Sequence, residues 1–444
     1  MASLTDQKLL WILRTEGAQS PATLMGRLEM SQPTLFRSAK AQSENIIALG
    51  AKRNRKLAAL RNVRQLGSMI PIFIISSEGE VVTLGKINSI YPSSFVFLPE
   101  ASTTKPYYYQ GLPFFLDDMR PQGFLGRSFS QRHLDLKLPS RILDWNNDDI
   151  LEALARRGED LPGNILVGAE SFERYQLEVN KRPEAIEEKH PEASYVSYAQ
   201  SAVDGSNVGS SAGGENPKFG AALLLNDGST RKVLVKFSPV GGTFAAQRWH
   251  DLLMSEYLAL EVLRENGVPA AVGRVFEGGG RTFLETVRFD RLGANGRIGI
   301  LSLSALENEF TGHGSNWSVS AQLLERDKII STHDLNIIQK LECFGRLIAN
   351  SDRHSGNLSF FWEPGERIAK LAPVYDMLPM NYAPSIGGEK IERNFTLPTF
   401  DHTLLSAWKE ALPLAVHYWT RVREDTRISQ EFKKIAERNL EVLG

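Results

Sequence analysis

The stretch Asn350–Asn357 reads Asn-Ser-Asp-Arg-His-Ser-Gly-Asn, and another acidic residue, Asp376, follows after a short gap. Asp352 and Asn357 stand five positions apart, which is the spacing of the H-R-D-x-x-x-x-N catalytic loop of protein kinases. In that loop the Asp accepts the proton of the attacking hydroxyl, while the Asn and a later Asp hold magnesium ions. The pattern therefore predicts a phosphotransfer site. The alternative is two unrelated polar surface loops, where Asp and Asn are common.

The segments around this stretch predict how it is held. Residues 341–349 carry apolar side chains at helical spacing, and the polar, Gly-containing cluster that follows predicts a helix end near Asn350. Residues 358–362 and 368–374 read as strands with a Pro-Gly turn between them. The acidic positions then flank a hairpin, which can direct both of them toward one metal cluster.

A lysine and a glutamate upstream extend the pattern. Lys236 interrupts the apolar run of a predicted strand, 231–237, that follows an Asn-Asp-Gly turn. It is either a point charge for nucleotide phosphates or an ordinary edge-strand lysine. Residues 255–263 predict an amphipathic helix that ends before an Asn-Gly pair and a proline. Glu256 on this helix either pairs with Lys236, as in protein kinases, or is a solvated helix carboxylate.

The segment 209–220 is rich in Gly and Ser and includes Gly213 and Gly214. Small residues let backbone N–H groups approach phosphate oxygens closely. The segment is not a Walker A loop, because G-x-x-x-x-G-K-[ST] is absent. Ser/Gly-rich runs are often flexible linkers. The position of this run just before the strand of Lys236 favours a loop that covers phosphates.

Together these motifs resemble the HipA family of bacterial toxin kinases. The matching segments are 210–214, 235–237, 287–291, 351–357 and 373–376, and the segments 111–116 and 121–123 resemble the N-terminal signature of that family. The resemblance implies an α+β fold with two kinase-like lobes, a mixed N-terminal lobe and a mainly helical C-terminal lobe. It also implies a serine/threonine kinase that uses ATP and magnesium and inhibits growth.

Carried over by position, the resemblance implies roles for individual residues. Asp352 is the catalytic base, and Asn357 and Asp376 are magnesium ligands. A serine that the kinase phosphorylates on itself falls at Ser210 or at its neighbour Ser211, where a phosphate adds about −1.5 to −2 charge to the loop. The residues implied in ATP binding are Lys236, Arg288, Phe289, Asp290, Gly213, Gly214 and His354. His354 is also expected to brace the loop by hydrogen bonds.

The chain departs from the family pattern at several positions. Val287 stands where the family commonly has Glu, and Gly356 stands where it often has Lys. Residues 215–217 read Glu-Asn-Pro in place of Gln-Glu-Lys, and the Tyr-Asp-Met at 375–377 lacks the Gly of D-F-G. These departures leave open a second function, a DNA-binding transcription regulator whose degenerate kinase fold senses a nucleotide.

The N-terminal residues predict a helix-turn-helix. Helices are expected over Leu4–Arg14, from Pro21 through Leu28 with Ser20 as N-cap, and from Ser31 onward. A predicted strand at 46–51 and the basic tip after it indicate the wing of a winged helix. With this head, the chain most resembles those HipA-like proteins that carry an N-terminal winged helix. The residues expected to contact DNA are Gln32, Thr34, Arg37, Lys40, Lys52, Arg53, Arg55 and Lys56. The alternative is a helical protein-docking module with a solvated basic face.

Length and composition are consistent with more than one domain. The 444 residues are divided into a winged helix-turn-helix domain at 1–65, an N-terminal kinase-like lobe at 66–290 and a helical C-terminal lobe at 291–444. The single cysteine, Cys343, excludes an internal disulfide framework and is typical of the reducing cytoplasm. No apolar run reaches the roughly 20 residues of a membrane span, and no signal peptide is expected. No zinc-binding pattern is present.

The resemblance also implies partners. A protein substrate is expected, and some family members modify a glutamate-tRNA ligase, so a translation factor or such a ligase is one possibility. DNA is expected to bind the N-terminal domain. An antitoxin is a further expected partner, unless the head itself is a built-in antitoxin-like regulator.

Overall fold

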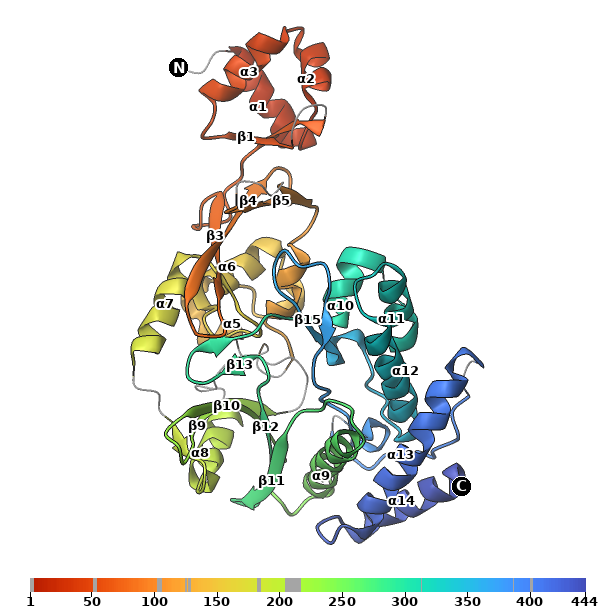
Figure 1. Cartoon of the computed structure of the whole chain (residues 1–444). Helices are drawn as coiled ribbons and strands as arrows, with labels where there is room; N and C mark the ends of the chain where they lie inside the picture. Colours follow the sequence, from red (N-terminus) through yellow and green to blue (C-terminus); the bar gives the residue numbers. More distant parts are fainter. Residues whose placement is uncertain are drawn as a thin grey trace.

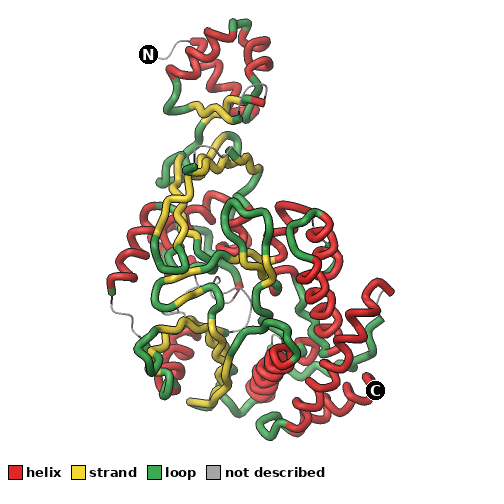
Figure 2. Tube along the Cα trace, viewed as in Figure 1, coloured by secondary structure: helices red, strands yellow, loops and turns green. Residues whose placement is uncertain are grey.

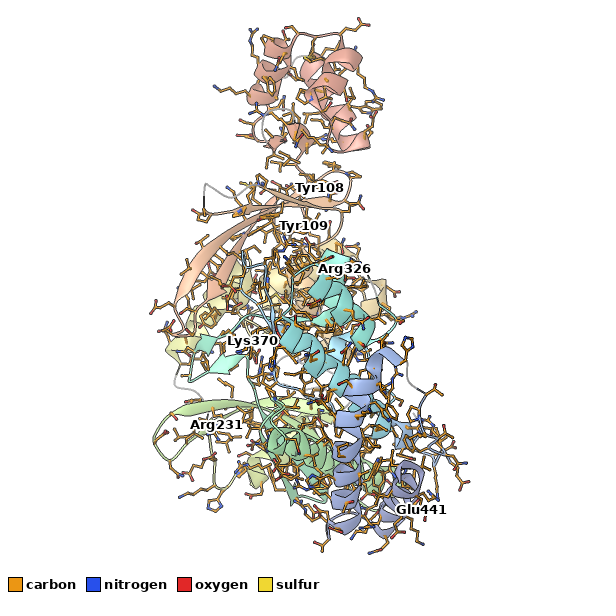
Figure 3. The ribbon with its side chains drawn as sticks, turned by 45° about the vertical axis from the view of Figure 1, so that its right-hand side comes forward. Tyr108, Tyr109, Arg231, Arg326, Lys370 and Glu441 are labelled. Carbon is orange, nitrogen blue, oxygen red and sulfur yellow. The ribbon has the colours of Figure 1, made fainter. Side chains whose placement is uncertain are left out.

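The computed structural model describes residues 4–50, 54–101, 106–123, 126, 129–181, 185–203, 217–312, 314–385, 387–399 and 402–444. A small head formed by the first residues lies at one end of the molecule, followed by a sheet and then by the larger remainder (Figure 1). Figure 2 shows that strands gather below the head and that long helices dominate the C-terminal part. In Figure 3, Tyr108 lies on the sheet below the head, whereas Glu441 lies at the opposite end.

The head has three helices and a hairpin. Its elements are α1 (Leu4–Glu16), α2 (Pro21–Leu28), α3 (Gln32–Ala41), β1 (Ile46–Leu49) and β2 (Lys56–Ala59). The hydroxyl of Ser20 accepts a hydrogen bond from the Thr23 N–H and Pro21 is the first helical residue, as the sequence predicted. Buried leucines from all three helices form its core. The first helix runs to Glu16, two residues beyond the predicted end.

The head is attached to the neighbouring sheet by backbone and side-chain contacts. Leu60, which follows β2, forms an antiparallel bridge with Ile90. The Arg61 guanidinium donates two hydrogen bonds to the carboxylate of Asp148, one of them at 2.9 Å. The side chain of Arg61 is largely buried there. These contacts fix the orientation of the head on the sheet below it.

That sheet has the strand order β6-β5-β4-β3-β7, with every pair antiparallel. Its strands are β3 (Met69–Ile75), β4 (Val81–Ile90), β5 (Ser94–Pro99), β6 (Tyr107–Tyr109) and β7 (Ile165–Val167). The short helices around it are η2 (Phe114–Met119), α5 (Phe129–Arg132), η3 (Leu134–Leu136) and η4 (Ile142–Asp144), and the longer ones are α6 (Asn147–Arg157) and α7 (Ala169–Asn180). The rings of Phe114 and Phe115 lie against Trp362, so this sheet shares the main hydrophobic core.

A second five-stranded sheet holds Lys236. Its order is β11-β12-β10-β9-β8, and only β8 and β9 are parallel. Its strands are β8 (Ile186–Glu187), β9 (Lys218–Leu224), β10 (Thr230–Phe237), β11 (Gly273–Gly278) and β12 (Arg281–Val287), and its helices are α8 (Glu192–Val203) and α9 (Phe244–Glu265). The predicted strand 231–237 is β10. The predicted helix 255–263 is the second half of α9, which begins earlier because Thr243 caps it.

The C-terminal part is mainly helical, as expected. Its strands are β13 (Arg291–Leu292), β14 (Gly296–Arg297), β15 (Ile300–Ser302), β16 (Ser359–Phe361) and β17 (Lys370–Leu371). Its helices are α10 (Leu303–Leu306), η5 (Glu307–Thr311), α11 (Trp317–Arg326), α12 (Thr332–Leu347), η6 (Ser355–Asn357), η7 (Met380–Tyr382), η8 (His402–Leu404), α13 (Leu405–Glu424) and α14 (Gln430–Leu443). The helix before the catalytic stretch therefore ends at Leu347, close to the predicted position.

The strand expected over 368–374 is wrong in extent, because only Lys370 and Leu371 pair with β16. The reason lies in the backbone partners of the following residues. The Val374 N–H donates to the carbonyl of Pro269 at 2.9 Å, and the Val374 carbonyl accepts from the Ala271 N–H at 2.8 Å. The chain thus leaves the hairpin and is bonded to the segment between α9 and β11.

Candidate active site

Lys236 is the centre of a buried group of charges. Its Nζ donates to both carboxylate oxygens of Glu256, at 2.6 and 2.7 Å, and also to the carboxylate of Asp376. Burial alone would lower the pKa of Lys236, but the carboxylates of Asp376 and Glu256 outweigh it and raise that pKa above its usual range. Lys236 therefore stays charged, and residues from β10, α9 and the loop after β17 meet at one point.

The pKa values of the two carboxylates of this group shift in opposite directions. Burial raises the pKa of Glu256, and the charge of Lys236 offsets this only in part. Burial also opposes ionisation of Asp376, yet Lys236 and Lys218 hold its pKa below the usual value. Its surroundings thus favour the ionised form of Asp376, which is the state that a cation ligand requires.

Asp376 has a left-handed backbone conformation, with φ of 52°. This conformation is unfavourable for a residue with a Cβ and persists where the surroundings hold it. The Asp376 N–H donates to Glu256 Oε1 at 3.2 Å, and the Asn350 side-chain amide donates to the Asp376 carbonyl at 3.4 Å. A residue held in this way at a predicted ligand position is typical of functional sites.

Asp352 and Asn357 are linked within the loop that follows α12. The Asp352 N–H donates to the side-chain oxygen of Asn350 at 3.0 Å, and the Asn357 side-chain N–H donates to the Asp352 carbonyl at 2.9 Å. The Asp352 side chain is 51% exposed, so it is open to a hydroxyl that approaches from outside. Asn357 is buried, and its amide is held in a fixed position.

His354 braces this loop through hydrogen bonds. Its Nδ1 accepts from the Gly356 N–H at 3.1 Å, and its carbonyl accepts from the Trp317 indole N–H at 3.0 Å. Its Nε2 lies 4.0 Å from Asp352 Oδ1. A Cβ added at Gly356 would lie 2.9 Å from the imidazole. The lysine that the family often has at this position would require His354 to move. The imidazole therefore occupies space that only a glycine at 356 leaves free.

Tyr375 joins the loop of Asp376 to the loop of Asn357, a role that the sequence patterns did not reveal. Its hydroxyl donates to the Gly356 carbonyl at 3.1 Å and shares a hydrogen bond with the Ser359 hydroxyl at 2.7 Å. Its ring lies 6.0 Å from that of Phe289, which in turn packs edge-on against Phe361. These rings form an aromatic wall beside the charged group.

Lys218 is a second cation that the sequence patterns missed. It stands directly opposite Lys236 in the β9–β10 ladder and is 2% exposed. Burial lowers the pKa of Lys218 to about 8, although Asp376 opposes this change. Its position next to the Gly/Ser-rich segment is the one signal in the sequence that could have indicated it. The two lysines place two ammonium groups beside the carboxylates of Glu256 and Asp376, where a phosphate could contact them.

Arg288 and Asp290, both implied in ATP binding, are engaged with each other. Arg288 donates to the two carboxylate oxygens of Asp290 at 3.0 and 2.8 Å, and Asp290 also accepts from Arg291 at 2.6 Å and from the Gly163 N–H at 3.0 Å. Burial alone would raise the pKa of Asp290, but Arg288 and Arg291 lower it far below the usual range. The pair therefore fastens β13 to the loop before β7.

Several predicted residues lie outside the described part of the chain. These are Ser210, Ser211, Gly213 and Gly214 of the Gly/Ser-rich segment, and Lys52 and Arg53 of the head. The remaining head residues proposed for DNA are exposed on α3 and around the start of β2. They are Gln32, Thr34, Arg37, Lys40, Arg55 and Lys56. The Arg55 guanidinium lies 5.4 Å from the centre of the Phe36 ring, which joins the hairpin to α3.

The oxygen ligands of the site suit magnesium. A carboxylate and an amide oxygen are hard ligands, and Mg²⁺ is usually bound by one or two carboxylates together with substrate phosphates. Within the described residues, no group of three or more His, Cys, Asp or Glu gathers as a protein-only metal site. Asp376 and Asn357 could hold such an ion, with Lys218 and Lys236 beside the phosphates.

Gly345 offers a test of how the catalytic loop is held. A Cβ at this position would lie 2.5 Å from Arg353 Cδ, and Arg353 donates to the Asn350 carbonyl within the loop. We expect Gly345→Ala to displace Arg353 and, with it, the loop that contains Asp352. The kcat of the expected phosphotransfer should then fall about tenfold or more, because small displacements of reacting groups are costly. Steady-state kinetics measures this effect. Gly26→Ala is the matched control, since nothing lies within 4 Å of its added Cβ. An unchanged kcat in Gly345→Ala would contradict the expectation.

Two family models match most of the chain after the head. Residues 66–176 match the family model of the YjjJ-like toxin middle domain, and residues 210–440 match that of the HipA-like C-terminal domain. The chain is 36% identical over 443 residues to toxin YjjJ of Escherichia coli K12, and the match covers 98% of this chain and 96% of that protein.

Within the described residues, none of the helices is both long and apolar enough to cross a membrane.

One solved structure shows the same fold. The chain is similar to the structure from Shewanella oneidensis MR-1 of the toxin-antitoxin system HipA and HipB with operator DNA, with a TM-score of 0.53, 14% identity and coverage of 84% of this chain and 95% of that chain. A proinflammatory kinase, CtkA of Helicobacter pylori, matches 53% of this chain and 92% of its own length with 15% identity and a TM-score of 0.37. The similarity to the Shewanella HipA structure confirms the expected α+β, two-lobed kinase-like fold.

Proposed function

Because this chain belongs to the HipA-like family of toxins, we propose that it is an ATP-dependent protein serine/threonine kinase whose activity inhibits growth. One observation carries the proposal: Lys236, Glu256 and Asp376 meet from three separate elements. The loop of Asp376 is in turn hydrogen-bonded through Tyr375 to the loop that contains Asn357. This arrangement supports the binding of a metal–nucleotide complex at a fixed place.

Each side chain then has a defined task. A bound Mg²⁺–ATP supplies the phosphoryl group to be transferred. Asp376 and Asn357 would hold the metal, and Lys236 and Lys218 would contact phosphate oxygens as point charges. The aromatic wall of Phe289 and Tyr375 offers a flat apolar surface for a nucleobase. Arg288 and Asp290 would fix the turn that carries Phe289.

Asp352 would act on the substrate hydroxyl. Its exposed carboxylate accepts the proton that a serine or threonine hydroxyl gives up as the hydroxyl oxygen attacks. The hydrogen bonds from Asp352 N–H and to its carbonyl hold the backbone in place, so the carboxylate needs little reorganisation. The same reaction on Ser210 or Ser211 would add negative charge to the loop beside the nucleotide.

The proposal is tested by labelling. Purified chain is incubated with γ-labelled ATP and magnesium, alone and with cell extract, and the modified residues are mapped by mass spectrometry. We expect phosphoserine or phosphothreonine in the chain itself and in an extract protein, such as a translation factor or a glutamate-tRNA ligase. Expression of Asp352→Ala should leave growth unimpaired. Absence of any phosphotransfer, together with toxicity that Asp352→Ala retains, would exclude the kinase.

A second candidate is a transcription regulator with a nucleotide-sensing kinase fold. The exposed basic residues on α3 and β2 favour it, as does the rigid attachment of the head through Arg61. This candidate predicts nucleotide binding without phosphotransfer, together with specific DNA binding. A kinase that also represses its own promoter would show both activities, with an antitoxin or the head itself as the regulator.

DNA binding by the head gives a separate prediction. Arg37→Ala should weaken binding to all sequences by a similar factor and should reduce the slope of log Kd against log salt by about 1, because one phosphate contact is lost. Fluorescence anisotropy at several salt concentrations measures both. Lys8→Ala is the control, since Lys8 is also exposed in the head but lies on α1. Equal effects of the two changes would argue against α3 as the DNA-contacting helix.

A further inference from the structure

A cavity of about 570 Å³ lies beyond the charged group at Lys236. It opens to solvent and is lined by the loop that follows β10, by the first turns of α9 and by the turn between β11 and β12. Its polar lining residues include Ser238, Thr243, Gln247, His250, Arg281 and Thr282. The sequence patterns gave no indication of this cavity, and no step of the proposed phosphotransfer uses it.

Arg281 is the central residue of the cavity wall. It is 8% exposed, its Nη1 donates to the Ser238 carbonyl at 2.8 Å, and its guanidinium lies 5.4 Å from the centre of the Phe237 ring. An arginine has five N–H donors, and the bond to Ser238 uses one of them. Burial lowers the pKa of Arg281. The guanidinium is thus held rigidly at the surface of the cavity.

The charge of Arg281 lacks a counter-ion. Among the described residues no carboxylate forms an ion pair with it, whereas Arg248, which is similarly buried on α9, pairs with Glu431 at 3.2 Å. A buried charge without an opposite charge costs free energy, and proteins normally supply a partner. An anion in the cavity would be that partner.

The other walls also suit an anion. The N-terminus of α9 faces the cavity, and the first turn of this 22-residue helix contains no acidic residue. Its amide groups therefore present a positive potential. The hydroxyl of Thr282 and the imidazole of His250 lie 2.6 Å apart in the same wall. One carboxylate, that of Glu277, lies at the rim, 3.7 Å from His250 and 71% exposed.

We propose that this cavity binds a phosphate group, either as the free ion or as the phosphate of a phosphorylated serine. The guanidinium of Arg281 and the N-terminus of α9 recognise the phosphate oxygens. Since α9 also carries Glu256, a phosphate bound here would hold the helix that pairs with Lys236. The site would thus be an effector site next to the proposed catalytic group.

Isothermal titration calorimetry of the full chain tests the proposal. The nucleotide site is first saturated with magnesium and a non-hydrolysable ATP analogue, so that added phosphate cannot bind there. Inorganic phosphate and O-phospho-L-serine are then titrated separately, with sodium chloride of equal ionic strength as the blank. We expect saturable binding of at least one of them. Binding of phosphate alone indicates the free ion, and preferential binding of phosphoserine indicates a phosphorylated residue.

Two exposed side chains provide matched variants of opposite sign. Gln247→Glu is nearly isosteric and adds a negative charge to the wall, so we expect it to weaken binding roughly tenfold. Glu277→Gln removes the rim carboxylate, so we expect tighter binding by a few-fold. Absence of saturable binding, or equal affinity in both variants and the parent chain, would overturn the proposal. Because binding is measured without phosphotransfer, the result is independent of whether the chain is a kinase.

Discussion

Replacement of Lys236 by Met is expected to lower both the stability of the chain and its phosphotransfer. Lys236 is the buried partner of two carboxylates, Glu256 and Asp376, and its Nζ lies 2.6 Å from Glu256 Oε1. Its removal leaves these two carboxylates facing each other without the ammonium group between them. Breaking a buried ion pair from one side typically costs about 3–5 kcal/mol. The loss of the phosphate contact should reduce phosphotransfer to a level close to background.

The pH dependence of this loss follows from the remaining carboxylates. Burial raises the pKa of Glu256, and without Lys236 that pKa would rise further. The folded variant then binds more protons than its unfolded chain, so its free energy of unfolding falls as the pH rises above the ordinary pKa of a glutamate. Urea unfolding at several pH values measures this trend.

Lys370→Met is the control for this experiment, because Lys370 is an exposed lysine on β17 (Figure 3). A Lys236→Met variant that unfolds at the same urea concentration as the parent chain, at all pH values, would show that the buried group is not as tightly coupled as its geometry indicates. The double variant Lys236→Met, Glu256→Gln should regain part of the lost stability, since one of the two unpaired charges is removed.

Asp352→Asn is expected to reduce kcat by about 10²–10⁴-fold, which is the usual contribution of a general base. The amide cannot accept the proton of the hydroxyl, although it has the same shape. The KM for ATP and the free energy of unfolding should change little, because the Asp352 carboxylate is half exposed and the bonds that hold the loop use its backbone. Steady-state kinetics with ATP as the varied substrate separates kcat from KM.

Asp144→Asn serves as the control. Asp144 is an aspartate in η4, and 55% of its side chain is exposed. A loss of ATP affinity in Asp352→Asn that equals its loss of kcat would indicate that Asp352 acts in nucleotide binding rather than as a base. Unchanged kcat would remove Asp352 from the mechanism altogether.

The parts of the fold that were predictable are those in which local sequence determines the structure. The helices of the head follow from apolar spacing, from the Ser20 cap and from a proline at the first helical position. The strand of Lys236 follows from alternation after a turn. The loop at 350–357 could be proposed as a catalytic loop because its residues are close together in the sequence, and it stays a prediction.

The remaining features depend on contacts between distant segments. The predicted strand at 368–374 ends early because Val374 is bonded to Pro269 and Ala271, about a hundred positions away in the sequence. Lys218 and Tyr375 acquire their roles from partners across a ladder or in another loop. Arg281 has no carboxylate partner in the part of the chain that the structure describes, which no pattern along one segment can reveal.

The backbone bonds between Val374 and the segment at 269–271 have a consequence for motion. They attach Asp376, two residues later, to the segment that follows α9, while Tyr375 and Asn350 bond the same loop to the neighbourhood of Asn357. Any movement of α9 away from the Asn357 loop would strain these bonds and would change the distance between the two proposed magnesium ligands. An ion held by both ligands would oppose that movement by the same free energy by which the movement would weaken binding of the ion.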